Sequence, residues 1–239
     1  MVDLHVLVLA GTAVLLGALV QGAVGLGVGL VAAPVVTLLD PTLMPVSLLV
    51  AGFILPALML AAEREHIDRR VGWVLAGRLL GTAPGVWALS VLSTDQLAAV
   101  VGALVLVGVA LTVRTFAVPV NRSTLTTAGF VSGVGATAAS IGGPPLALVY
   151  QHEHAARLRS TLALVFALGS LVSLVALALA GQVQARALWA GIGFLPFLAA
   201  GLGLSVVLRS RLAGTRFRAA VLVVVSVSAL AALTQGLWR

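Results

Sequence analysis

Long stretches without a charged residue are the feature that most restricts how this chain can fold. Residues 71–94 form one such stretch, interrupted only by Arg78, and uninterrupted runs cover 4–39, 41–62, 96–113, 123–152, 160–185, 187–208 and 219–238. A helix needs roughly 17–25 apolar residues to cross a bilayer. Within lipid, only helices and closed barrels pair all their backbone groups. The runs lack the alternating polarity of barrel strands, so we predict an all-α polytopic membrane protein.

Composition supports this prediction and excludes several classes of function. The 239 residues are 61% hydrophobic and 9% charged, whereas soluble domains carry about 25% charged residues. No cysteine is present, which excludes disulfide frameworks, thiolate chemistry and cysteine metal sites. The net charge of +7 comes from arginines near span ends, a pattern that favours contact with the lipid bilayer over nucleic-acid binding. We expect no metal, no cofactor and, without a P-loop, no ATP-driven motor in this chain.

Eight spans are predicted within a single membrane domain covering residues 1–239. The N-terminus lacks a positive n-region and is read as an uncleaved first span. The first run is too long for one straight crossing, because residues 4–39 would extend roughly 54 Å as a helix. Glycine and proline weaken a helix, so Gly22, Gly25, Gly27, Gly29 and Pro34 predict a break in this run. The predicted spans are 4–39, 43–62, 71–92, 96–117, 123–150, 158–180, 187–208 and 216–237.

A second glycine-rich segment, residues 129–145, suggests two related halves, 4–117 and 123–238. An offset of 111 places Gln21 on Ser132 and Pro34 on Pro145, and an offset of 116 places Trp73 on Trp189. Duplicated halves that each carry an interrupted span are typical of secondary transporters.

The distribution of arginines leaves the orientation of these halves open. Arg64, Arg69 and Arg70 indicate that connection 63–70 is cytoplasmic, but arginines 157–159 and 209–218 would then lie on the opposite side of a simple eight-span arrangement. If the 4–39 run passes twice, the halves are inverted and the signs agree. We predict that connections 63–70 and 209–218 share the cytoplasmic side, with parallel halves as the alternative.

The glycine motifs resemble those of the sulfite exporter TauE/SafE family of bacterial membrane permeases. The resemblance rests on Gln21-Gly22-x-x-Gly25-x-Gly27, on the segment 129–133, and on Ile141-Gly142-Gly143-Pro144-Pro145. It continues through residues 159–163 and 216–218 and covers nearly the whole chain. Relatives often have a further Gly and Pro where this chain has residues 31–34, and more glycine where it has residues 136–139. The resemblance implies export or uptake of sulfite or sulfur-containing organic anions across the bacterial inner membrane.

The two breaks are the predicted binding site for a small anionic solute. Broken helices expose unpaired N–H and C=O groups that can coordinate ions, while glycines permit close approach of a solute. Close helix packing through small residues is the alternative. Arg159 could attract an anion or snorkel to lipid headgroups. The predicted residues are Gln21, Gly22, Gly25, Gly27, Ser132, Gly133, Thr137, Ser140, Gly142, Gly143, Pro144, Pro145 and Arg159.

Arg78 and residues 152–154 are interpreted as structural rather than functional. Arg78 lies in a span, where an ionisable residue is a functional candidate, but we expect it to snorkel toward Arg69 and Arg70. The sequence His152-Glu153-His154 is interpreted as an ordinary loop, because too few ligands accompany it for a metal.

The sequence therefore favours a secondary permease for a small anion, working by alternating access around a central site. One alternative is a scaffold or assembly subunit that uses its small residues for packing alone. A less favoured alternative is an intramembrane enzyme, which would need a nucleophile and a base, or a metal, at membrane depth. The substrate, the direction of transport, the coupling ion and homo-oligomer formation are left open.

Overall fold

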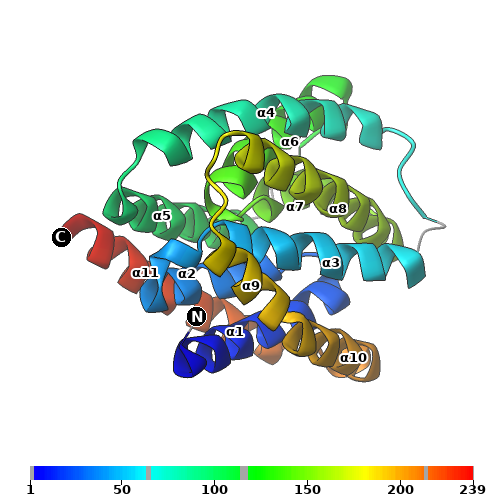
Figure 1. Ribbon diagram of the computed structural model, residues 1–239. Helices are drawn as coiled ribbons and strands as arrows, with labels where there is room; N and C mark the ends of the chain where they lie inside the picture. Colours follow the sequence, from blue (N-terminus) through cyan, green and yellow to red (C-terminus); the bar gives the residue numbers. More distant parts are fainter. Residues whose placement is uncertain (1–2, 63–65, 114–117, 213–214, 239) are drawn as a thin grey trace.

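The computed structural model describes residues 3–62, 66–113, 118–212 and 215–238, and these are helices joined by short connections, with no strand among them. The chain folds into one bundle (Figure 1). The elements in order are α1 (Leu4–Val24), α2 (Val28–Leu39), the 3-10 turn η1 (Pro41–Leu43), α3 (Val46–Ala62), α4 (Val71–Val91), α5 (Thr94–Val113), α6 (Arg122–Ala139), α7 (Gly143–Tyr150), α8 (Ala155–Leu179), α9 (Ala185–Gly193), α10 (Leu195–Leu212) and α11 (Thr215–Trp238).

The prediction of an all-helical membrane protein is confirmed. Among the described residues, α1, α4, α8 and the stretch Ala185–Leu208 of α9 and α10 are long and apolar enough to cross a membrane. Shorter apolar helices are Val28–Leu39, Val46–Ala62, Thr94–Ala110 and Val225–Gly236. Large apolar side chains on the outside, such as Leu80, Trp87 and Val207, are more than half exposed. Extensive apolar exposure of this kind suits contact with lipid.

Both predicted interruptions are present. The first run breaks after α1 at Gly25, whose φ of 98° is left-handed and therefore favours glycine, and α2 begins after Gly27. Residues 123–150 break in a similar way: α6 ends at Ser140, also left-handed with a φ of 59°, and α7 begins after Gly142. Pro34 does not form the first break but lies inside α2. A further interruption, at Phe194 between α9 and α10, was not predicted from the sequence.

The first broken run turns back on itself. A Cβ on Gly17, within α1, would contact the backbone of Val28 at the start of α2. α2 then leads to Asp40, which pairs with Arg186 near the start of α9. The end of the bundle marked by this pair is called the Arg186 end.

The opposite end of the bundle is reached by α3. After α3 the chain passes Asp68 and Arg70, and Arg70 contacts Glu153 just before α8. We call this the Arg70 end. In Figure 1, α3 and α8 lie side by side between the two ends. The beginning of α8 lies at the Arg70 end, and its far end leads to α9 and the Arg186 end.

Small residues allow several helices to approach closely. α4 packs on α6, α1 on α10, and α5 on α11. At the α4–α6 contact, a Cβ on Gly133 would overlap the carbonyl group of Arg78. Such backbone proximity is typical of membrane helix pairs. It leaves the middle of the bundle to α2, α3, α7 and α8, where the two breaks meet.

Candidate functional site

The two breaks border one cavity of about 50 Å³ in the middle of the bundle. Gln21, Gly27 and Val28 line it from the first break, and Ser140, Gly142 and Gly143 line it from the second. The remaining wall is formed by α3 and α8, which contribute Leu48, Leu49, Gly52, Phe166 and Ser170, and by Arg78 of α4. Segments more than a hundred residues apart in the sequence therefore line one cavity.

Gln21 connects the two helices of the first break. Its side chain is 4% exposed, and its Oε1 accepts a hydrogen bond of 3.0 Å from the backbone N–H of Val28. The first N–H groups of a helix have no partner within the helix. Gln21 satisfies one of them, and so holds the start of α2 against α1.

The second break is anchored by Ser140, and its prolines have a structural role. The Ser140 hydroxyl donates to the carbonyl of Pro45 at 2.9 Å, which ties the end of α6 to the start of α3. Pro144 and Pro145 occupy the first turn of α7, where a missing N–H costs nothing. Because they have no N–H to offer a solute, Gly142 and Gly143 are the backbone donors of this turn that border the cavity.

Arg78 corrects the sequence-based interpretation. We expected its side chain to snorkel toward the membrane surface, but it is 2% exposed and lines the cavity. Its Nη1 donates to the Ser132 hydroxyl at 2.9 Å and to the Ser132 carbonyl at 3.3 Å. The cause is the helical face on which Arg78 lies: Val74, Gly77 and Gly81 on the same face pack into the bundle, and they direct Arg78 inward.

Several other predicted residues support the cavity without lining it. Ser132 holds Arg78. The Thr137 hydroxyl lies 2.8 Å from that of Ser173 and joins α6 to α8. Gly25 supplies the left-handed turn, and Gly133 allows α6 to approach the backbone of Arg78. These four residues position the site rather than form its wall.

Gly22 and Arg159 lie elsewhere, at a second cavity of about 110 Å³. Its walls come from α1, the end of α3, the start of α8 and α10. A Cβ on Gly25 would contact Arg159, so this cavity adjoins the first break on the side of the Arg70 end. The structure thus separates these two residues from the central group predicted with them.

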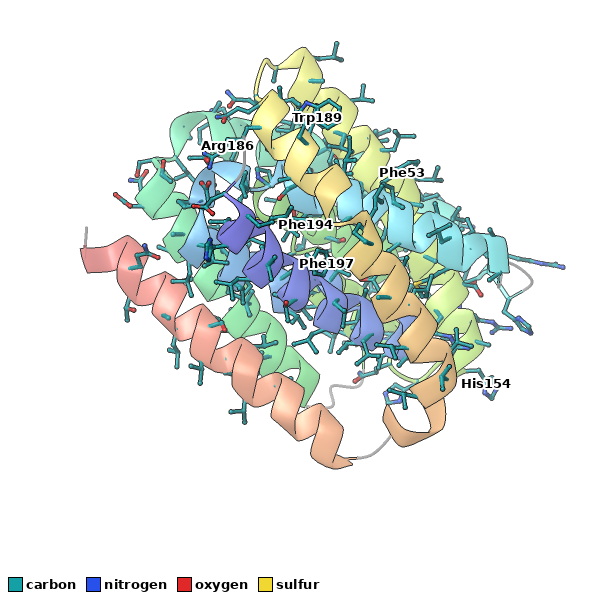
Figure 2. The ribbon with its side chains drawn as sticks, turned by 60° about the horizontal axis from the view of Figure 1, so that its bottom comes forward. Phe53, His154, Arg186, Trp189, Phe194 and Phe197 are labelled. Atoms are coloured by element: carbon teal, nitrogen blue, oxygen red, sulfur yellow. The ribbon has the colours of Figure 1, made fainter. Side chains whose placement is uncertain are left out.

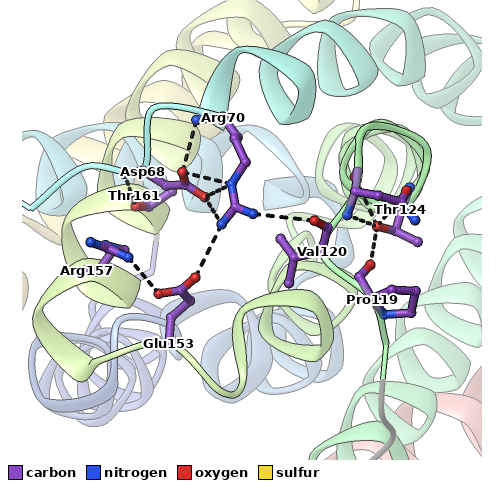
Figure 3. Close-up of polar contacts among 9 residues, drawn as sticks. Asp68, Arg70, Pro119, Val120, Thr124, Glu153, Arg157 and Thr161 are labelled. Atoms are coloured by element: carbon purple, nitrogen blue, oxygen red, sulfur yellow. Dashed lines mark hydrogen bonds and ion pairs between the residues drawn. The ribbon is translucent and has the colours of Figure 1, made fainter.

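Charged side chains join the connections at the Arg70 end (Figure 3). Arg70 pairs with Asp68 at 3.1 Å and with Glu153 at 3.3 Å, and Glu153 also pairs with Arg157 at 3.0 Å. The Asp68 backbone N–H donates to the Thr161 hydroxyl at 2.9 Å. Burial by itself raises the pKa of Asp68, but the hydrogen bonds and charge of Arg70 outweigh it and hold that pKa below its ordinary value. Glu153 thus belongs to an ion-pair network, in agreement with the loop interpretation of residues 152–154.

A smaller ion-pair network occupies the Arg186 end. Arg186 pairs with Asp40 at 2.7 Å and donates to the Thr42 hydroxyl at 3.4 Å. Figure 2 shows Arg186 at one end of the α9–α10 pair and His154, the neighbour of Glu153, toward the other. The central cavity lies between the two networks, because it is lined by α3 and α8, which connect the two ends.

Comparison with known proteins gives one result. A family model described as Sulfite exporter TauE/SafE matches residues 9–232. Searches of curated proteins and of solved structures found no match. The family match covers nearly all of the chain, including both breaks, the central cavity and both ion-pair networks. The chain therefore belongs to the sulfite exporter TauE/SafE family of membrane transporters.

Proposed function

We propose that the protein is a secondary permease that carries a small anion, such as sulfite or a sulfonate-type anion, across the bacterial inner membrane. The observation that carries this proposal is the meeting of two helix breaks at one cavity, which the buried Arg78 also lines. Helix breaks offer backbone groups to a solute without requiring charged ligands, and a buried arginine favours a negatively charged one.

An internal duplication is the second part of the proposal. The two left-handed residues, Gly25 and Ser140, are 115 residues apart in the sequence, and so are the two N-cap residues, Gly27 and Gly142. Helix contacts are also reciprocal: α1 packs on α10 as α6 packs on α4, and α2 packs on α11 as α7 packs on α5. These regularities support two related halves, each with one broken run that turns back on itself.

The halves are proposed to be inverted in the membrane. The first half starts at the Arg186 end and the second at the Arg70 end, where Arg122 begins α6. Arg122 lies over the ring of Trp73, at 5.1 Å from its centroid, near the start of α4. Arg69, Arg70, Arg122, Arg157 and Arg159 all belong to the Arg70 end. By the positive-inside rule, this end faces the cytoplasm.

Alternating access would then depend on the two ion-pair networks. Arg70 and Arg186 are 116 residues apart, the offset that also relates Trp73 to Trp189. Each arginine binds a carboxylate in the connection that follows the other half's broken span, Glu153 and Asp40 respectively. Pairs whose arginines are more than 40% exposed contribute only about 0–1 kcal/mol. We propose that each network closes one end of the pathway and is weak enough to open during transport.

The contacts of the Ser132 and Ser140 hydroxyl groups do not favour the enzyme alternative. Ser132 accepts from Arg78, and Ser140 donates to a carbonyl; within the described residues, neither contacts a base. The scaffold alternative gives no role to a buried charge beside a cavity.

The test is flux of sulfite into proteoliposomes that contain the purified protein. We expect saturable uptake that exceeds the leak of protein-free vesicles and is competitively inhibited by other small anions. A correctly folded preparation that carries neither sulfite nor methanesulfonate faster than empty vesicles would overturn the permease proposal and favour a scaffold.

A further inference from the structure

Arg78 is the buried ionisable residue at membrane depth whose charge remains to be explained. It is the eighth residue of α4, 2% exposed, and donates through Nη1 to Ser132. Its Nε is buried and has no hydrogen-bond partner among the described residues. A buried donor without a partner destabilises the fold, and more strongly when the group is charged. A ligand that accepts from this guanidinium would remove that cost.

The space around the guanidinium is built from glycines of other helices. A Cβ added to Gly169 of α8 would overlap Nε of Arg78, and one added to Gly142 would lie 2.9 Å from Nη1. The guanidinium therefore fits between α8 and the start of α7 only because both positions lack a side chain. A methyl group at position 169 would displace it.

A protein counter-charge is missing from this part of the molecule. Among the described residues, no carboxylate lies within ion-pair distance of Arg78. All seven carboxylates lie in the sequence at helix ends or between helices: Asp3, Asp40, Glu63, Glu65, Asp68, Asp95 and Glu153. A buried charge is expected to be paired. Because none of the described carboxylates pairs with Arg78, a bound anion would supply the missing counter-charge.

The partial charges of the helix ends around the cavity do not neutralise the positive charge of Arg78. α2 and α7 begin there, with partial positive charge, while α1 and α6 end there, with partial negative charge. The two positive and the two negative helix ends oppose one another, so their partial charges largely cancel. Among the lining residues that the structure describes, Arg78 is the one ionisable side chain. The net charge offered to a solute is therefore close to one positive unit.

The geometry points to Arg78 as the direct ligand of the transported anion, at a site for one compact, singly charged oxyanion. This inference rests on the permease proposal and narrows its substrate class. The cavity of about 50 Å³ has room for on the order of four water-sized groups, which suits an oxyanion of a few atoms. A dianion would leave one buried negative charge unpaired, and a bulky organic sulfonate would not fit.

The experiment compares three probes that separate charge from size. Bisulfite at mildly acidic pH is compact and singly charged, sulfate is compact and doubly charged, and benzenesulfonate is singly charged and bulky. Binding to the detergent-purified protein is measured by calorimetry, and flux is measured in proteoliposomes. The variants are Arg78→Gln, Arg78→Lys and Gly169→Ala, with Arg69→Gln as the control that removes an exposed arginine.

For the wild type we expect bisulfite to bind about tenfold or more tightly than sulfate or benzenesulfonate. Arg78→Gln should weaken bisulfite binding roughly 30-fold or more, the usual result of removing one partner of a buried charge pair. Arg78→Lys should retain part of the affinity, because it keeps the charge but not the planar fork of donors. Gly169→Ala should weaken binding by displacing the guanidinium, and Arg69→Gln should match wild type.

The outcomes distinguish this inference from the permease proposal. If wild type carries bisulfite and Arg78→Gln binds and carries it equally well, Arg78 is not the ligand although the permease proposal stands. If wild type prefers sulfate or benzenesulfonate, the assigned charge or size is wrong. If folded wild type carries none of the three anions, the permease proposal itself fails. Arg78→Gln removes a buried charge without changing helix packing much, so it should fold.

Discussion

Gln21 combines a structural contact with a place at the cavity. From sequence alone, a polar residue beside a helix break is expected to face a solute, and replacing it should affect affinity without affecting stability. The structure changes the second expectation, because the Gln21 Oε1 is the partner of the buried Val28 N–H. Loss of the side chain leaves that buried N–H without its protein partner.

Gln21→Ala is therefore predicted to lower the free energy of unfolding by roughly 1–3 kcal/mol, the cost of a buried unpaired donor. Thermal unfolding of the detergent-purified variant, followed alongside wild type, measures this. Gln96→Ala is the matched control: its Oε1 also accepts a backbone N–H, from Ser93 at 2.9 Å, but at an exposed position. Equal stability of the two variants would show that the Gln21 contact contributes little.

Asp68 allows a prediction about pH. Because its folded-state pKa lies below the ordinary value of 3.8, its pairing with Arg70 adds stability above that value. The contribution is lost as the pH falls through the lower folded-state pKa. The stability difference between wild type and Asp68→Asn should thus be constant from about pH 8 to 5 and shrink below about pH 4. A difference that already shrinks near pH 6 would mean that another group controls this network.

Part of the cavity lining could be predicted from the sequence because breaks are local and packing is not. Gly27, Ser140, Gly142 and Gly143 lie at interruptions that glycine and proline already mark, and all four border the cavity. Arg78 was missed because its depth in a span permits either snorkelling or burial. Its position on one helical face with Gly77 and Gly81 was the available signal, since glycines on a membrane helix mark the packed side.

Among the elements, both breaks could be predicted from glycine and proline, but the register that relates them could not be decided. The sequence offset of 111 superposes Gln21 on Ser132, whereas the left-handed residues and the N-cap residues of the two breaks are 115 residues apart. The difference of four residues is close to one helical turn of 3.6 residues. A shift of one turn keeps side chains on the same helical face, so small residues match nearly as well in either register. The backbone conformations of Gly25 and Ser140 favour the offset of 115 for the proposed duplication.

The two ion-pair networks are predicted to limit access to the cavity from opposite ends of the bundle. A cysteine at Ser170, which lines the cavity, reports access from either side because the chain has no native cysteine. Arg186→Gln should speed labelling by an impermeant thiol reagent from the Arg186 end only, and Arg70→Gln from the Arg70 end only. Exposed ion pairs contribute about 0–1 kcal/mol, so the expected increase is up to about fivefold.

A charge exchange provides the control for this experiment. Asp40→Arg combined with Arg186→Asp restores the pair in reverse and should return the labelling rate toward wild type. If both single variants change labelling from the same side, or if neither changes it, the networks do not close opposite ends of one pathway.

At the scale of the whole molecule, the reversal of α2 along α1 reconciles the arginine distribution. A single crossing by residues 4–39 would put the arginines of the two halves on opposite sides. Because α2 returns to the Arg186 end, the predicted first half starts at that end of the bundle and leads to Arg122 at the Arg70 end. The sequence allowed both parallel and inverted halves, since hydropathy measures the length of an apolar run and not whether the run reverses. Of the predicted cytoplasmic connections 63–70 and 209–218, residues 63–65 and 213–214 lie outside the described structure.

Topology can be tested at two exposed positions of the described chain. Ser93 lies between α4 and α5 at the Arg186 end, and His154 precedes α8 at the Arg70 end. In intact cells, Ser93→Cys should react with an impermeant thiol reagent added outside, and His154→Cys only after the membrane is opened. The reason is that Arg69, Arg70, Arg122, Arg157 and Arg159 lie at the Arg70 end, and loops rich in arginine remain cytoplasmic. Labelling of His154→Cys alone in intact cells would reverse the assigned orientation, while labelling of both would contradict the placement of these connections on opposite sides of the membrane.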